Sequence, residues 1–210
     1  MSSVGVEEVH SAVVLADEVA VVYERGATPA VSGVSFRLDA GKGLLVSGPR
    51  GVGLTSLLRG VLGLVGHEGT LEVFGGIPGG RATVGRIGYG PQGWPIPPAL
   101  SARAVLRMVT RLKGRPYGEA DELGERVGLS DLNRAADRLQ VEDVRRLSLA
   151  CSLVGDPELL ILDDPWEFPE TVREVESALA RGAACIAASH DPGGLPALLG
   201  QTLTIGGDDE

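Results

Sequence analysis

Residues 48–56 form a glycine-rich segment that constrains the fold more than any other part of the chain. The segment consists of Gly48, Pro49, Arg50, Gly51, Val52, Gly53, Leu54, Thr55 and Ser56. It fits the phosphate-binding pattern G-x-x-x-x-G-K-[ST], except that Leu54 replaces the lysine. Glycines in such a loop let successive backbone N–H groups face phosphates, and the following helix adds its positive N-terminal end. We therefore expect a strand, a tight loop and a helix, in that order.

The replacement of lysine by Leu54 removes the cation that such loops place beside the outer phosphates, whereas Thr55 keeps the hydroxyl that holds magnesium. A hydrogen bond to a charged group contributes roughly 1.5–3 kcal/mol, so affinity should fall about tenfold to a hundredfold. The loss in rate should be larger, because such sites stabilise charge on the transferred phosphoryl group. Arg50 either restores some of this charge or faces solvent, and its place early in the loop favours solvent.

Hydrophobic patterning around the loop supports this order of elements. Residues 44–47 form a short apolar run, and apolar residues recur at helical spacing after the loop. Residues 19–23 and 34–38 indicate two strands of an N-terminal antiparallel sheet, joined by the turn-rich residues 26–29.

Strands and helices alternate over the rest of the chain. We expect further strands at 70–74, 86–89, 159–162 and 184–188, and helices at 144–154 and 171–181. Alternation of this kind implies a parallel sheet with helices on its faces. Residues 93–140 interrupt it with an amphipathic helix at 102–113, a second helix at 118–127, and a stiff segment around Trp94 and its neighbouring prolines. The expected fold is α/β and of the P-loop NTPase type. It is a single domain over 1–210 with an N-terminal antiparallel β subdomain and a helical insertion at about 93–140.

Polar side chains follow several of the predicted strands. Asp163 and Asp164 end one, His190 ends a second, and Gln92 follows a third. Ligands of parallel sheets gather at the carboxyl ends of the strands, so these side chains should meet Thr55 around one nucleotide. The alternative is that His190 is simply a polar residue of the core.

Composition narrows the function classes. The net charge is −9 without a basic block, which argues against nucleic-acid binding. Cys151 and Cys185 lie in apolar runs and are expected to be buried free thiols of a reducing compartment. Apolar runs stay well below the roughly 18–20 residues that span a bilayer. We expect a cytoplasmic chain, peripheral to the inner face of the membrane through a partner.

The chain resembles the nucleotide-binding domain of ABC (ATP-binding cassette) transporters over essentially its whole length. The matching segments are residues 34–36 before the loop, 48–56 as Walker A, 88–92 (Gly-Tyr-Gly-Pro-Gln) as the Q-loop, 145–150 as the helix after the signature motif, 155–158 as the following turn, 159–165 as Walker B, and 189–191 (Ser-His-Asp) as the switch-histidine segment. Their common order makes chance agreement improbable.

The resemblance implies roles for individual residues. ATP would lie on residues 48–56, with Mg²⁺ held by Thr55, Gln92 and Asp163. Asp164 would be the general base, and His190 and Gln92 would sense the γ-phosphate. Tyr23 falls where the family stacks an aromatic ring on adenine, although a tyrosine at a strand end is also common.

Several departures from the family pattern weaken the implied chemistry. Leu54 replaces the Walker A lysine, and residues 139–143 (Leu-Gln-Val-Glu-Asp) replace the Leu-Ser-Gly-Gly-Gln signature. Glu142 and Asp143 would there meet a phosphate with like charge. Asp164 is one CH₂ shorter than the family's glutamate. A D-loop with a Leu-Asp pair is missing, and residues 166–169 (Trp-Glu-Phe-Pro) form a shorter segment.

The sequence thus predicts an ATP-binding subunit of an ABC-type membrane transporter with weakened or absent hydrolysis. Its expected partners are a transmembrane subunit and a second ABC ATPase subunit, in a homodimer or heterodimer. The main alternative is a non-catalytic structural or regulatory subunit. A weaker alternative is an ABC-type ATPase outside transport, in repair or translation, against which the acidic charge argues.

Overall fold

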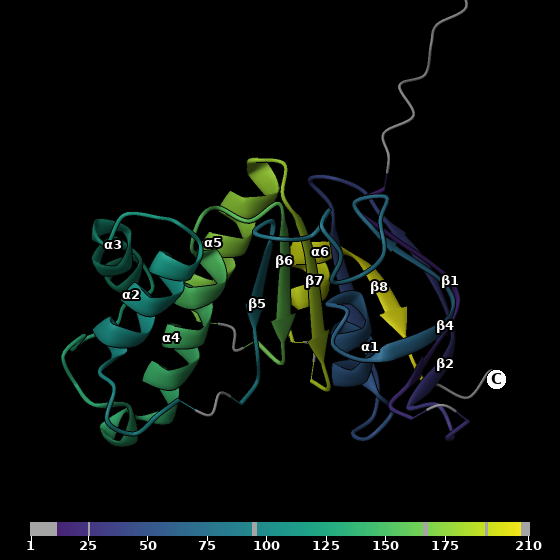
Figure 1. Cartoon of the computed structure of the whole chain (residues 1–210), viewed down its shortest axis with the longest axis horizontal. Coiled ribbons are helices and arrows are strands. Elements are labelled where there is room, and N and C mark those ends of the chain that lie inside the picture. Colours follow the sequence, from purple (N-terminus) through teal and green to yellow (C-terminus); the bar gives the residue numbers. More distant parts are fainter. Residues whose placement is uncertain (1–11, 25, 94–95, 166–167, 192, 207–210) are drawn as a thin grey trace, which may run out of the picture.

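The computed structural model describes residues 12–24, 26–93, 96–165, 168–191 and 193–206. Three layers are visible in Figure 1: a five-stranded parallel sheet in the middle, a group of helices on one side, and helix α1 with a three-stranded antiparallel sheet on the other. The α/β fold class predicted from the sequence is therefore confirmed, including the N-terminal antiparallel part.

The antiparallel sheet contains β1 (Val14–Val22), β2 (Val31–Leu38) and β4 (Gly66–Val73) in the order β2-β1-β4. The predicted pairing of the first two strands is confirmed, although β1 begins earlier than expected. A register shift between Ala16 and Val19, with Glu18 at φ 50°, changes which residues of β1 point inward. Strict alternation fails at this bulge, so the sequence pattern does not reveal the first half of β1.

The parallel sheet has the order β5-β6-β7-β3-β8. Its strands are β3 (Gly43–Ser47), β5 (Ile87–Gly90), β6 (Leu159–Asp163), β7 (Ala184–Ser189) and β8 (Gly200–Thr204). Every residue of β6 and β7 is buried, because layers cover both faces of the sheet.

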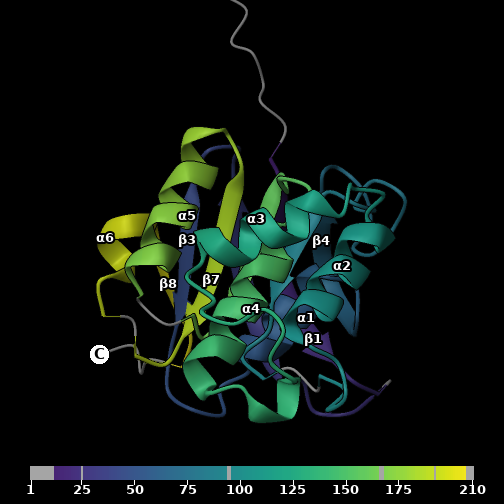
Figure 2. The same cartoon turned by 90° about the vertical axis from the view of Figure 1, so that its left-hand side faces the viewer.

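Helices cover one face of this sheet, as Figure 2 shows from that side. The helices against the sheet are α4 (Val141–Leu153), α5 (Pro169–Ala180) and α6 (Leu195–Leu199). Helices α2 (Ala102–Leu112) and α3 (Gly118–Arg126) pack on α4, and a 3₁₀ turn spans Ala136–Arg138. Helix α1 (Leu54–Val61) lies on the opposite face, in a second hydrophobic cluster with the antiparallel strands. No helix among the described residues is both long and apolar enough to cross a bilayer.

Helices α2 and α3 appear where the helical insertion was predicted. Arg103 of α2 pairs with Asp121 of α3 at 2.7 Å. The Lys113 ammonium donates to the carbonyls of Ile87 and Val154, at 3.1 and 2.9 Å, and so fastens the end of α2 to the sheet and to the end of α4. The boundaries 93–140 for a separate subdomain remain a prediction, and Trp94 and Pro95 lie outside the described residues.

Helix α6 and strand β8 were not predicted. Helix α6 has only five residues, and β8 has no buried residue, so neither produces a clear periodic signal. Strand β8 nevertheless pairs with β3 along its full length, from Gly43↔Gly200 to Ser47↔Thr204. Tertiary pairing, rather than local pattern, creates this strand.

The parallel register brings the carboxyl ends of the strands to one edge. Gly90 pairs with Leu162, Asp163 with Ala188, and Ser47 with Ser189. The segments that follow β3, β5, β6 and β7 therefore emerge side by side.

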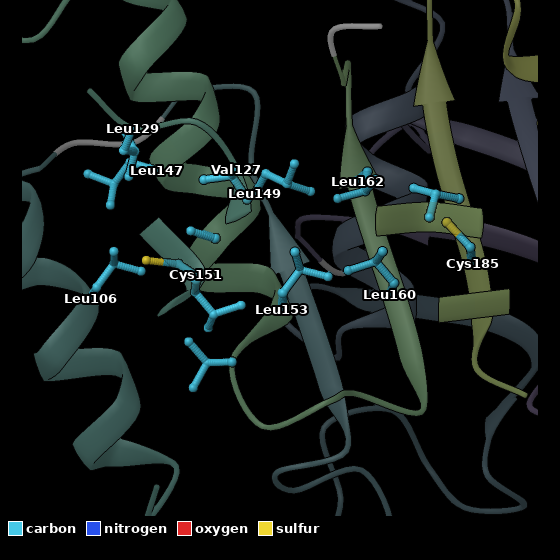
Figure 3. Packing of buried hydrophobic residues seen from close by; sticks show 14 of the residues in the cluster. Leu106, Val127, Leu129, Leu147, Leu149, Cys151, Leu153, Leu160, Leu162 and Cys185 are labelled. Atoms are coloured by element: carbon cyan, nitrogen blue, oxygen red, sulfur yellow. The ribbon is translucent and has the colours of Figure 1, made fainter. Parts of the chain in front are cut away.

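Both cysteines are buried, as predicted, and free. Cys151 of α4 and Cys185 of β7 belong to the cluster between the helices and the sheet (Figure 3). Burial raises the pKa of the Cys151 thiol strongly and that of the Cys185 thiol to about 12.

We therefore expect neither thiol to react with a water-soluble disulfide reagent at about pH 8 in the native protein, because reaction requires an accessible thiolate. Both should react after unfolding in guanidinium chloride. The measurement is thionitrobenzoate release with and without denaturant. Release of one equivalent from the native protein would show that this cluster opens or is packed differently.

Candidate phosphate-binding site

The loop after β3 leaves backbone N–H groups unpaired at the start of α1. The first intrahelical bond runs from the Leu57 N–H to the Gly53 carbonyl at 2.9 Å. Within the described chain, the N–H groups of Gly53, Leu54, Thr55 and Ser56 find no acceptor. Gly53 occupies the N-cap position and has no side chain that could cap the helix. Unpaired donors at a helix N-terminus are the basis of an anion site.

Two glycines allow this loop to fold where it does. A Cβ atom on Gly53, which has φ 97°, would lie 2.3 Å from the Ala30 carbonyl oxygen. A Cβ atom on Gly48 would lie 2.3 Å from the Ile205 carbonyl oxygen, just beyond β8. Only glycine fits at either position. The loop thus has the strand, tight turn and helix start that the sequence pattern predicted, and its use as a phosphate cradle stays a prediction.

The other loop residues divide between core and solvent. Pro49, Arg50 and Gly51 form the outer part of the loop, where Arg50 and Gly51 are exposed, and Val52 is half-buried against the antiparallel-sheet cluster. The Leu54 side chain is only 3% exposed and lies inside that cluster. Leu54 can therefore serve the cradle only through its backbone, and its side chain follows the core rather than the path of a phosphate-facing lysine.

Thr55 and Asp163 meet directly, as expected for a shared magnesium site. The Thr55 Oγ1 hydroxyl donates to Asp163 Oδ1 at 3.1 Å. Burial raises the pKa of Asp163, and the neighbouring Asp164 raises it further, while the Thr55 hydrogen bond opposes the shift. A cation at this point would relieve the cost of the buried charge.

Gln92 and Asp164 also come together. Gln92 Nε2 donates to Asp164 Oδ2 at 2.7 Å, and the Ser189 hydroxyl lies 3.3 Å from Asp164 Oδ1. Asp164 has φ 50° and donates its N–H to the Ala188 carbonyl at 2.7 Å, so the turn after β6 orients its carboxylate. The Arg145 guanidinium holds the Asp164 carbonyl at 3.0 Å.

His190 bridges the end of β7 to the phosphate loop. Its Nδ1 lies 2.9 Å from the Gly48 carbonyl oxygen. Because a carbonyl can only accept, Nδ1 carries the hydrogen, and Nε2 remains the acceptor in the neutral ring. This contact between residues far apart in the sequence joins His190 to the loop.

Tyr23 lies just after β1 and is tied to the start of α1. Its hydroxyl is 3.1 Å from Ser56 Oγ and accepts from Arg59 Nη1 at 3.2 Å. The Ser56 hydrogen bond and the Arg59 charge lower the pKa of Tyr23. With 53% of the residue exposed, the ring is available beside the loop.

The start of α4 differs from a phosphate-binding helix end. Gln140 is the N-cap and makes no side-chain capping bond, while Glu142 and Asp143 occupy the first turn. Asp143 is buried and lies 3.8 Å from Arg146, whose guanidinium stacks over the Phe168 ring at 4.5 Å. Acidic side chains already offset the positive helix end. Trp166 and Glu167 of the shortened D-loop segment lie outside the described residues.

Sequence reasoning overlooked Ser189, Arg145 and Arg59 as individual contributors to the site. Ser189 adjoins His190 at a strand end, which is a usable signal. Arg145 and Arg59 carry no such signal, because they reach the site from helix surfaces. A cavity of about 680 Å³ lies beside the Arg86–Glu158 pair, at the edge of the sheet where the parallel strands begin. It contains none of the predicted site residues.

The fold and the site together define a P-loop nucleotide-binding domain. A family model described as ABC transporter matches residues 31–167. The chain therefore belongs to the ABC transporter family.

Two relatives illustrate the similarity. The cytochrome c biogenesis ATP-binding export protein CcmA of Paracoccus denitrificans is 33% identical over 82% of this chain and 80% of its own length. The linearmycin resistance ATP-binding protein LnrL of Bacillus subtilis is 33% identical over 64% of this chain, which spans only 46% of that relative.

Solved structures agree on the fold. An ATP-binding subunit of an ABC transporter superposes with a TM-score of 0.80 at 16% identity, covering 92% of this chain and 85% of that one.

The buried charge at the end of β6 leads to a stability prediction. Asp163→Asn should raise the melting temperature of the ligand-free protein at about pH 7, because it removes a buried charge and keeps an acceptor for Thr55. In a domain of this size, about 1 kcal/mol corresponds to roughly 2–4 °C.

The pH dependence of this effect has a definite sign. Folding raises the pKa of Asp163, so its ionised form costs stability above the folded-state pKa and nothing below the unfolded-state value. The advantage of the Asp163→Asn variant over the wild type should vanish as the pH falls through the pKa of Asp163. Asp137→Asn, at an exposed aspartate, is the control for calorimetry. A lower melting temperature for Asp163→Asn at neutral pH would contradict the prediction.

Proposed function

We propose that the chain is the ATP-binding subunit of an ABC-type membrane transporter and that its ATP hydrolysis is weak or absent. The carrying observation is the group of unpaired N–H donors at the start of α1, set at the same sheet edge as Asp163, Asp164 and His190. Membership of the ABC transporter family supports ATP as the ligand. Its curated relatives include the ATP-binding export and resistance proteins named above.

Each group has a place in this proposal. Residues 48–56 would hold the phosphates, and Tyr23 would stack on adenine. Thr55, Gln92 and Asp163 would hold Mg²⁺, since hydroxyl, amide and carboxylate oxygens suit this hard cation. Asp164 would orient water, and His190, in its doubly protonated form, would donate Nε2–H to the terminal phosphate. ATP supplies the phosphoanhydride bond whose cleavage the family couples to transport.

Two observations support weak hydrolysis. The buried Leu54 side chain brings no charge to the phosphates. The first turn of α4 presents the exposed Glu142, with the buried Asp143 behind it, where a partner's phosphate would bind in a head-to-tail dimer. A homodimer would carry both defects in each composite site. A heterodimer with an intact homologue would distribute them, one to each site.

The proposed partners follow from the family. A transmembrane subunit would hold the chain at the cytoplasmic face of the membrane, with the residues at about 93–140 as its docking region. A second ABC ATPase subunit, identical or homologous, would complete the nucleotide sites. Nucleic acid has no place in this proposal.

Placing a lysine at position 54 tests this proposal by titration calorimetry. Leu54→Lys should tighten Mg-ATP binding by roughly tenfold or more, because it adds a charged hydrogen bond to the phosphates. Leu54→Met is the matched control, since methionine has similar length, keeps apolar packing and adds no charge. Thermal melts of both variants measure how much stability is lost when the buried Leu54 side chain is replaced.

Unchanged ATP affinity in a folded Leu54→Lys variant would contradict this prediction. Failure of the wild type and of Leu54→Lys to bind at millimolar Mg-ATP would remove ATP as the ligand.

A non-catalytic structural or regulatory subunit is the second candidate function. The acids in the first turn of α4, with buried Asp143 beside Arg146, favour it. The purified chain should then release no phosphate from ATP above the background of an Asp164→Asn variant. Clear turnover that Thr55→Ala or Asp164→Asn abolishes would exclude this candidate. An intact family member assayed in parallel is the positive control.

A further inference from the structure

The burial of Leu54 raises the question of which cation meets the outer phosphates. The Leu54 side chain is only 3% exposed and lies in the core, so it brings no charge to the loop. A triphosphate bound at the N-terminus of α1 would still be attracted by the partial positive charge of that helix end, but this charge is only about half an elementary charge. Apart from the proposed Mg²⁺, a full positive charge at the phosphates would have to come from another residue.

Arg50 is placed to provide it. The residue sits at the exposed tip of the loop, between Pro49, whose ring restricts φ, and Gly51, which has φ 88°. It lines a cavity of about 490 Å³ whose wall also includes Asp164 and His190. Arg50 therefore shares one cavity with Asp164 after β6 and His190 after β7.

Arg50 is the positively charged residue of a cavity that otherwise carries negative charge. Asp164 and Asp191 contribute two carboxylates, and Arg50 is the only arginine or lysine among the described lining residues. Nearby arginines are engaged elsewhere: Arg145 holds the Asp164 carbonyl, and Arg59 holds the Tyr23 hydroxyl. Within the described part of the chain, Arg50 makes no hydrogen bond or ion pair. Its charge is thus available to a ligand.

We propose that Arg50 replaces the missing loop lysine as the cation for the terminal phosphate of ATP. This inference rests on the proposed ATP-binding function. Guanidinium is always charged and binds phosphate oxygens in bidentate fashion, so it can do this from the loop tip. Because its cavity contains Asp164 and His190, Arg50 should act on the third phosphate and discriminate ATP from ADP.

The test measures binding by calorimetry with Mg-ATP and Mg-ADP. Arg50→Gln should weaken Mg-ATP binding by roughly tenfold and Mg-ADP binding much less. Arg50→Lys should keep part of the affinity. Arg81→Gln, at an exposed arginine remote from this cavity, is the matched control and should change neither. Both arginines are exposed, so the variants should fold, which thermal melts verify.

A double-mutant cycle with Leu54→Lys makes the test specific. If Arg50 substitutes for the lysine, the effect of Arg50→Gln on Mg-ATP binding should shrink severalfold in the Leu54→Lys background. Equal effects in both backgrounds would overturn substitution, as would equal losses for ATP and ADP.

The outcomes separate this inference from the proposed function. ATP binding that Arg50→Gln leaves unchanged overturns the role of Arg50 while ATP binding stands. Binding only after Leu54→Lys has the same meaning, because Arg50 then fails to replace the lysine. Absence of ATP binding in the wild type and in Leu54→Lys overturns both proposals.

Discussion

The site depends on backbone N–H groups that the first turn of α1 cannot pair internally. Every helix start has such donors, but here no other described residue satisfies them. Gly53 packs under Ala30 of the antiparallel part, and Gly48 packs under Ile205 beyond β8. These close approaches hold the loop from two sides, which keeps the donors oriented without any side-chain cap. The rest of the site is assembled around this helix end.

The site needs acidic groups that would bind a cation and basic groups that would bind phosphate, and this chain provides the acidic groups more completely. The acidic half is complete: Asp163 meets Thr55, and Asp164 meets Gln92 and Ser189. The burial of the Asp163 carboxylate carries a cost in free energy that a magnesium ion would relieve. The basic half lacks its usual ammonium group, because Leu54 joins the core. The loop thus keeps its backbone donors for phosphate but lacks the lysine, and the proposed source of the positive charge is Arg50.

Sequence patterns predict elements well where burial produces a regular signal. The continuous apolar runs of β6 and β7, and the helical spacing in α1, α2 and α4, are recognisable because each is covered by neighbouring layers. The bulged first half of β1, the short α6 and the exposed β8 are not, because their positions come from pairing and packing with distant residues. The structure places Thr55 against Asp163 and Gln92 against Asp164. Arg145 and Arg59 were overlooked, since helix surfaces give no sequence sign of reaching a site.

The sequence by itself determined the α/β class, the glycine loop with its missing lysine, and the set of polar residues at strand ends. These follow from local chemistry: hydrophobic period, glycine conformational freedom and the residue types that magnesium and phosphate prefer. Only the tertiary structure decided that Leu54 turns into the core, that His190 bonds to Gly48, and that Arg50 shares a cavity with Asp164. Such facts depend on the register of non-adjacent strands and on side-chain packing, which no local pattern contains.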